Sequence, residues 1–196
     1  MITKEKILDY YWNYYVKLEE DFLKISKYVE ICKTNYNTYS MEYLKLYQAI
    51  CSEVDVIAKE ICVNCGVPIK KTEGIGNWGY YIEKDYPDII SFKVNCQDLV
   101  INPYPNWKHE EYVDNEGKLR KRLVGNSRNP KWWTEYNKVK HKRIVLSEEK
   151  KGFNYKKANL KNVLFSLAGL FAFELILFEI FDIDKEQYSS QIFKVL

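Results

Sequence analysis

Apolar residues recur at helical spacing in the first third of the chain. Residues 5–30 hold many good helix formers and few breakers, which predicts a first helix over about 4–30. A second series recurs every three or four positions at Leu44, Tyr47, Cys51, Val54, Ala58 and Ile61. Ser40 is a suitable N-cap and Gly66 a suitable C-cap, so a second helix is predicted over about 41–65.

The pattern changes between residues 70 and 124. A short helix is expected near Trp78–Lys84, and after it Ile90, Phe92 and Val94 alternate with polar residues as in a strand. The turn Asp114-Asn-Glu-Gly117 separates two further short segments and favours a hairpin there. We therefore expect an irregular insertion over about 70–124 that contains a small β-hairpin.

Two more helices are predicted in the last third of the chain. Asn129 and Pro130 suit the first positions of a helix over about 130–146. Residues 157–181 are apolar on almost every helical face, and their length is enough to cross a membrane. Glu174 and Glu179 interrupt this run, and charged side chains are costly inside a bilayer. We favour a buried central helix and expect no membrane association, with a membrane-peripheral helix as the weaker alternative.

These elements predict a mainly α fold with one domain over residues 1–196. A chain of 196 residues with 46% hydrophobic content can bury one sizeable core. The five cysteines are an odd number, and the charged start of the chain has no signal-peptide pattern. We therefore expect a cytoplasmic protein with free thiols.

The net charge is only +3, so attraction to nucleic acid must come from local clustering. Between Lys118 and Arg143 ten basic residues accompany a single acid, Glu135, and three aromatic residues. This composition favours contact with an RNA backbone, although a solvated basic surface explains it equally well. The residues predicted to contact RNA are Arg128, Lys131, Lys138 and Lys142.

A helical wheel over residues 130–146 separates the side chains further. The wheel predicts one apolar arc formed by Trp132, Trp133, Tyr136, Val139 and Ile144. Asn137 and His141 lie together at the edge of this arc, where packing can hold an imidazole that still reaches a substrate. Lys140 and Arg143 fall inside the arc, so they require acidic partners or anionic ligands.

Acidic partners for these cations are available on the other predicted helices. Glu174 lies among apolar residues of the last helix, and Asp55 borders the apolar stripe of the second helix. Glu53 is expected to point away from that stripe. We hypothesise that Asp55 and Glu174 meet the Lys140, His141 and Arg143 neighbourhood. A purely structural buried ion pair is an equally good interpretation.

No metal or cofactor site is expected. Cys62-Val-Asn-Cys65 has neither a second cysteine pair nor a nearby histidine, and His109 lies in a loop-like region without a matching ligand cluster. The sequence contains no GxxxxGK[ST], GxGxxG, GxSxG or HExxH string. These absences disfavour nucleotide hydrolysis, dinucleotide chemistry, α/β-hydrolases and zincins.

The segment Trp132-Trp-Thr-Glu-Tyr-Asn-Lys-Val-Lys-His141, together with Ser52-Glu-Val-Asp55 and the apolar last helix, resembles the HEPN superfamily. These proteins are small helical bundles found in bacterial toxins and phage-defence systems, including abortive-infection proteins. Their metal-independent ribonuclease motif is an arginine, usually a polar residue, three variable residues and a histidine. Asn137 and His141 match that motif, whereas Tyr136 stands at the arginine position.

The resemblance implies an RNA-directed phage-defence or toxin protein that acts as a metal-independent endoribonuclease. His141 would be the general acid or base, and Lys140 or Arg143 would stabilise charge on the phosphate. Family members often pair two motifs across a dimer, so a homodimer is expected. The alternative is a non-catalytic HEPN-like module that binds RNA or a protein partner, with Tyr136 marking a lost nuclease.

Overall fold

The computed structural model describes residues 2–147 and 152–196, and it is mainly α-helical. The α-helices are α1 Lys4–Lys6, α2 Asn13–Ser26, α3 Met41–Asn64, α4 Ile75–Asp85, α5 Lys131–His141 and α6 Leu160–Ile180. A π-helical segment, Ile7–Trp12, joins α1 to α2. Single 3₁₀ turns occupy Lys33–Asn35, Ile69–Lys71, Pro87–Ile90 and Asn154–Lys157.

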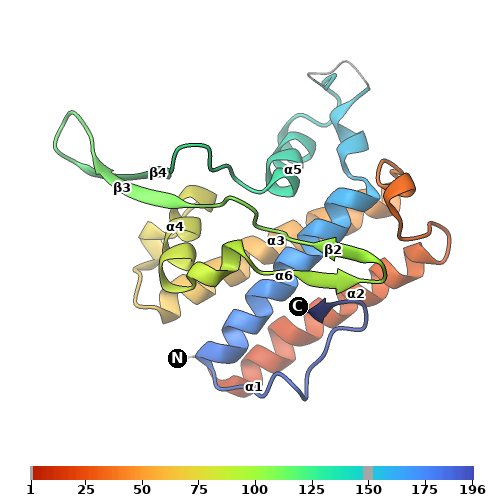
Figure 1. Ribbon diagram of the computed structural model, residues 1–196, viewed down its shortest axis with the longest axis horizontal. Helices are drawn as coiled ribbons and strands as arrows, with labels where there is room; N and C mark the ends of the chain where they lie inside the picture. Colours follow the sequence, from red (N-terminus) through yellow and green to blue (C-terminus); the bar gives the residue numbers. More distant parts are fainter. Residues whose placement is uncertain (1, 148–151) are drawn as a thin grey trace.

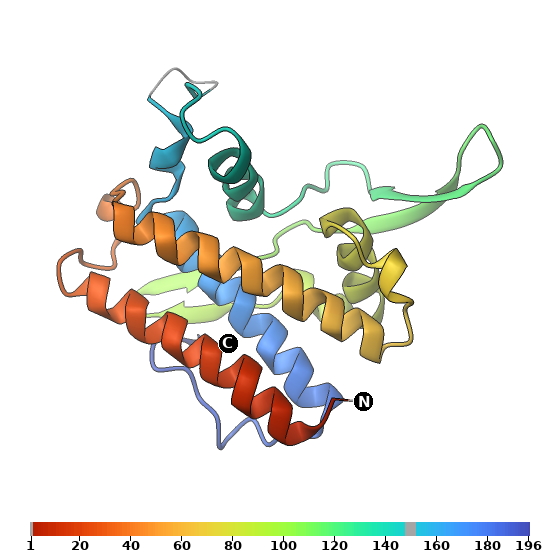
Figure 2. The same ribbon diagram turned by 180° about the vertical axis from the view of Figure 1, so that it is seen from behind.

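Three long helices, α2, α3 and α6, form the centre of the molecule. Figures 1 and 2 show α6 packed against both α3 and α2, with α5 crossing one end of the group. α6 carries sixteen buried residues because nearly every one of its faces meets another element. Buried apolar side chains from Ile7 to Phe193 belong to one continuous core.

The predicted limits of the helices are partly confirmed. Ser40 caps α3, since its hydroxyl accepts a hydrogen bond from Tyr43 N at 3.0 Å, and Gly66 follows with a φ of +82°. The first helix ends at Ser26 rather than at 30. The last helix begins at Leu160 rather than at 157. Asn159 is its N-cap, because the side-chain oxygen Oδ1 accepts a hydrogen bond from Asn162 N at 3.1 Å.

The prediction that the third helix reaches residue 146 is wrong, because α5 ends at His141. The carbonyl oxygen of Lys142 accepts a hydrogen bond from Asn154 Nδ2 at 2.9 Å instead of continuing the helix. Tyr155 N donates a hydrogen bond to the carbonyl of Arg143, and Asn154 N donates one to the carbonyl of Val145. These contacts hold residues 142–147 as a turn that follows the helix and ends in the bridge between Leu146 and Phe153.

The insertion contains the hairpin predicted around residues 114–117, but the strand predicted from Ile90 begins only at Val94, because Ile90 ends a 3₁₀ turn. Strands β1 Val94–Cys96 and β2 Leu99–Ile101 form one hairpin, and β3 His109–Val113 and β4 Leu119–Leu123 form another. β5, Lys194–Val195, returns from the end of the chain and pairs antiparallel with β1, which gives a three-stranded sheet β2-β1-β5. The β3-β4 hairpin packs against α4 at its base, and its turn projects away from the helices (Figure 1).

Cations of this projecting hairpin have acidic or aromatic neighbours. Arg122 Nε lies 2.7 Å from Glu110 Oε1, and Arg120 Nε lies 2.8 Å from Asp114 Oδ2. Lys118 pairs with Glu116, and Lys121 lies over the ring of Tyr81. The cations at 118–122 therefore lie on a mixed-charge arm, separate from those of α5.

α6 meets the length and composition requirements for crossing a membrane. Among the residues that the structure describes, it is the one helix that does so, and 78% of its most apolar window is buried against other elements. Core helices of globular proteins share this property. The absence of membrane association stays a prediction.

Candidate functional site between α3 and α5

A polar pocket of about 440 Å³ lies between α3 and α5. It brings together four of the residues predicted from the sequence, which are Asp55, Tyr136, Asn137 and Lys140. The rest of the lining consists of Cys51, Ser52, Val56, Lys59, Glu73, Gly74, Ile75 and Trp133. Asp55 and Lys140 therefore line the same pocket.

Asp55 is held by two neighbours at the wall of this pocket. Its Oδ1 accepts a hydrogen bond from Trp78 Nε1 at 3.1 Å, and its Oδ2 pairs with Lys59 one turn along α3. Trp78 is fully buried, so Asp55 satisfies an indole donor that would otherwise lack a partner. The carboxylate thus has a structural role on one oxygen and a charged partner on the other.

Asn137 and Lys140 contribute the α5 wall of the pocket. The Asn137 amide donates to the carbonyl of Trp133 at 3.2 Å, which fixes its orientation along the helix. Lys140 Nζ lies 5.7 Å from the centre of the Tyr136 ring, and Lys140 is exposed. The pocket therefore presents an amide and an ammonium group beside the Asp55–Lys59 pair.

Tyr136 stands at the arginine position of the motif and belongs mainly to the core. Only 6% of it is exposed, and its ring meets those of Tyr47 and Trp133 at 5.8 and 5.5 Å. Burial raises the pKa of Tyr136 to about 12, so its phenol stays protonated at neutral pH. It therefore supplies no positive charge to the pocket.

His141 and Arg143 lie outside the lining of the pocket. Both are exposed, His141 as the last residue of α5 and Arg143 in the segment that follows. Two predictions from the helical wheel are wrong. Lys140 and Arg143 do not face inward, and Ile144 does not belong to the apolar arc. The wheel assumed a helix to residue 146, whereas the helix ends at His141 and Ile144 is 81% exposed.

Glu174 does not meet this neighbourhood, which corrects the predicted contact. It is fully buried in α6, and neither carboxylate oxygen has a hydrogen-bond partner. Desolvation and the nearby Glu53 carboxylate raise the pKa of Glu174 well above its usual value. Glu53 is half-buried rather than turned away, and burial raises its pKa to about 7.

Glu135 was not predicted as a site residue, but its carboxylate lies near two cations. This side chain is 6% exposed, and it lies 3.5 Å from Lys138 Nζ and 3.6 Å from Lys157 Nζ. The spacing of Glu135 and Lys138 on one helix could have indicated the first pair. Lys138, predicted to contact RNA, is thus half-buried and next to a carboxylate.

The other three predicted RNA contacts are exposed. Arg128 lies in the loop before α5, Lys131 is the first residue of α5, and Lys142 follows the helix. Lys140, His141 and Arg143 are exposed as well. We call Lys140, His141, Lys142 and Arg143 the α5 basic end.

His109, expected in a loop, lies in β3 with its side chain 1% exposed. Burial lowers the pKa of His109 to about 4 from 6.5. As pH falls from 6.5 to 4, the unfolded chain binds this proton before the folded protein does, so stability decreases over that window. We expect an NMR titration of the single-histidine variant His141→Ala to show His109 neutral at pH 6. A midpoint near 6.5 would contradict its burial.

Cys62 and Cys65 pack at the end of α3. Cys62 Sγ lies 3.7 Å from the carbonyl of Trp78, and Cys65 Sγ lies 3.9 Å from the Tyr86 hydroxyl. Over residues 2–147 and 152–196, no group of three or more histidine, cysteine, aspartate or glutamate side chains is arranged to hold a metal ion.

Comparison with known proteins adds no family to this geometry. No family model, curated protein or solved structure matches the chain. Function must therefore be argued from the side chains themselves.

Proposed function

We propose that this chain is a HEPN-like, RNA-directed protein of the phage-defence or toxin type, which acts in the cytoplasm as a homodimer. The observation that supports RNA binding is the α5 basic end beside the polar pocket. Within the described residues, Lys140, Lys142 and Arg143 form no ion pair. In the projecting hairpin, by contrast, Lys118, Arg120 and Arg122 each pair with an acid. Unpaired, exposed cations at one helix end suit a phosphate backbone, which releases counterions on binding.

The pocket gives this surface a place for a nucleotide beyond the backbone. Asn137 offers an amide that can recognise a base edge, and Lys140 lies between the pocket and the exposed cations. The tryptophans of α5 do not serve as stacking platforms, because Trp132 and Trp133 are 2% and 7% exposed. Binding therefore depends on charge and hydrogen bonds more than on stacking.

The first test measures the affinity of a labelled single-stranded RNA over a series of salt concentrations. We expect the triple variant Lys140→Gln, Lys142→Gln, Arg143→Gln to lose on the order of a hundredfold in affinity at 0.1 M salt. Its slope of log affinity against log salt should fall by about 2, since each lost phosphate contact removes about 0.7.

A matched control removes the same charge elsewhere. Lys17, Lys24 and Lys45 are exposed on α2 and α3, and they line a different pocket between these two helices. Lys17→Gln, Lys24→Gln, Lys45→Gln should leave the affinity nearly unchanged. An equal loss in both triple variants would show a net-charge effect and would contradict a site at α5, and an absence of RNA binding would point to a protein partner.

A metal-independent ribonuclease is the catalytic version of this proposal. His141 is exposed at the end of α5, one turn after Asn137, so it can reach a ribose 2′-hydroxyl as general acid or base. Incubation of cellular RNA with the protein in EDTA, beside His141→Ala, tests this version. Cleavage retained by the variant would exclude His141 as the catalytic group. Salt-sensitive binding without any cleavage would leave the non-catalytic module, the version that the buried Tyr136 favours.

A further inference from the structure

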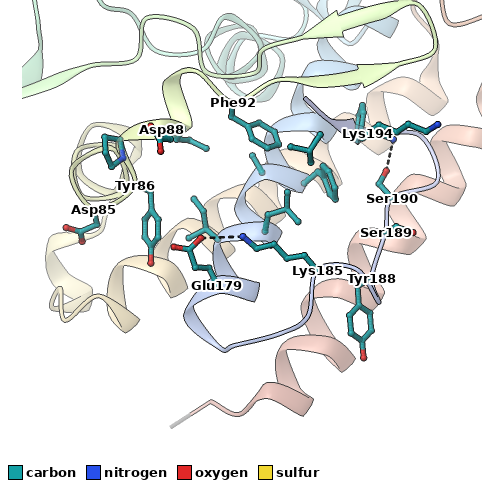
Figure 3. A pocket seen from close by; sticks show the side chains of 18 residues that line it. Asp85, Tyr86, Asp88, Phe92, Glu179, Lys185, Tyr188, Ser189, Ser190 and Lys194 are labelled. Carbon is teal, nitrogen blue, oxygen red and sulfur yellow. Dashed lines mark hydrogen bonds and ion pairs between the residues drawn. The ribbon is translucent and has the colours of Figure 1, made fainter.

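A cavity larger than the pocket between α3 and α5 lies elsewhere in the molecule, and the proposed function does not use it. It has a volume of about 820 Å³ and lies between α6, the end of α4 and residues 185–195 (Figure 3). We call residues 185–195 the C-terminal strap. Cavities of roughly 300–1,000 Å³ are typical of small-molecule sites.

The floor and walls of this cavity are apolar and partly aromatic. α6 contributes Phe171, Ala172, Leu175 and Ile176, while Ile89 and Phe92 come from the segment after α4 and Phe193 from the strap. Several aromatic rings, with that of Tyr86 on the α4 side, offer faces and edges to a planar ligand. An aromatic body therefore suits this cavity.

Fixed contacts hold the strap beside the cavity. Glu19 of α2 is fully buried, and its carboxylate accepts hydrogen bonds from the Ser190 hydroxyl and from Gln191 N, the latter at 2.9 Å. At the C-terminal end of the strap, β5 pairs with β1. At its N-terminal end, Lys185 Nζ lies 3.4 Å from Glu179 Oε2. The middle of the strap and its C-terminal end are therefore fixed beside the cavity, whereas the exposed Lys185–Glu179 pair adds little.

Charges at the rim are unevenly distributed. Asp85 and Asp88 lie on the α4 side, and neither forms an ion pair with a described residue. Glu179 is paired with Lys185, and Lys194 lies on the opposite side, as Figure 3 shows. The rim thus carries one more acid than base, although the whole chain has a net charge of +3.

We propose that this cavity binds a small aromatic amine, with its ring over the α6 floor and its cationic head beside Asp85 and Asp88. The apolar floor supplies most of the affinity by removing the ring from water. The two carboxylates select the head, and nearby aromatic faces also attract a cation. A carboxylate head would meet two like charges on that side of the rim.

Three probes with the same ring test the choice of head. We expect calorimetry to show 1-naphthylmethylamine binding about tenfold more tightly than 1-naphthoate, with 1-naphthalenemethanol between them. In the double variant Asp85→Asn, Asp88→Asn, the advantage of the amine over the alcohol should nearly disappear, while the alcohol binds as before. Tighter binding of the carboxylate, or no binding of any probe, would overturn the proposal.

A second pair of variants tests the place of binding. Leu175 is half-buried on the floor, so Leu175→Trp should fill the cavity and abolish binding of all three probes. Phe165 is a half-buried residue of the same helix outside the cavity, and Phe165→Trp should leave binding unchanged. Equal affinities in the two variants would place the probes elsewhere. The double aspartate variant keeps the head-group test valid if Leu175→Trp does not fold.

Discussion

Replacement of Trp132 by alanine is expected to lower the free energy of unfolding by about 3–5 kcal/mol. Its Nε1 donates to the carbonyl of Pro103 at 2.8 Å, and its own carbonyl accepts from the Tyr47 hydroxyl. Its ring meets that of Tyr104 at 5.8 Å and rests against Gly169 of α6. The truncation leaves a cavity where α3, α5, α6 and the insertion join. It also leaves the buried carbonyl of Pro103 without its hydrogen-bond donor.

Urea denaturation at neutral pH measures this loss. Thr134→Ala changes an exposed residue of the same helix, so it should alter stability by less than about 0.5 kcal/mol. Trp132→Phe keeps most of the ring volume but loses the hydrogen bond to Pro103, and its stability should fall between those of the other two variants. A loss below about 1 kcal/mol in Trp132→Ala would contradict the role of this side chain as a core anchor.

The aromatic residues of α5 thus serve packing rather than RNA binding. Sequence patterns could predict that these residues are buried. The wheel identified Trp132, Trp133, Tyr136 and Val139 as one buried arc because burial follows helical periodicity. The helices α3 and α6 could be predicted for the same reason, and their N-caps are local. Local patterns determine which residues face the core, but not which elements those residues meet.

Interactions between distant residues account for the errors. α5 ends at His141 because Asn154, thirteen residues later, binds the carbonyl of Lys142, and no breaker in the sequence indicates this. β5 could not be predicted because its partner β1 lies about a hundred residues earlier. In the candidate site, Asp55 and Lys140 line one pocket, whereas Glu174 lies near another carboxylate, that of Glu53. Charge complementarity alone cannot identify a partner when a fold buries an acid in its protonated form.

Glu174→Leu is expected to stabilise the protein by about 1–3 kcal/mol at pH 7, because it removes a fully buried carboxyl group whose oxygens have no hydrogen-bond partner. Burial raises the pKa of Glu174, so the folded protein retains a proton that the unfolded chain releases above pH 4.5. Ionisation then favours the unfolded chain, and stability decreases by about 1.4 kcal/mol per pH unit until the pH passes the pKa of the folded group. Glu53, with its pKa raised to about 7, adds to this decrease between 4.5 and 7. Leucine removes the Glu174 contribution and fills the same apolar position.

Urea denaturation of both proteins from pH 4.5 to 8.5 separates this effect from the other titrating groups. His109 changes stability in the opposite direction below pH 6.5, but it is present in both proteins and cancels in the difference. The stabilisation by leucine should therefore be smallest at pH 4.5 and grow with pH. Glu174→Gln should show the same growth with a smaller gain, because its amide stays buried without a partner. If the difference in the free energy of unfolding does not depend on pH, Glu174 ionises as readily in the folded protein as in the unfolded chain. A nearby cation, or water entering between α3 and α6, would then have to stabilise its charge.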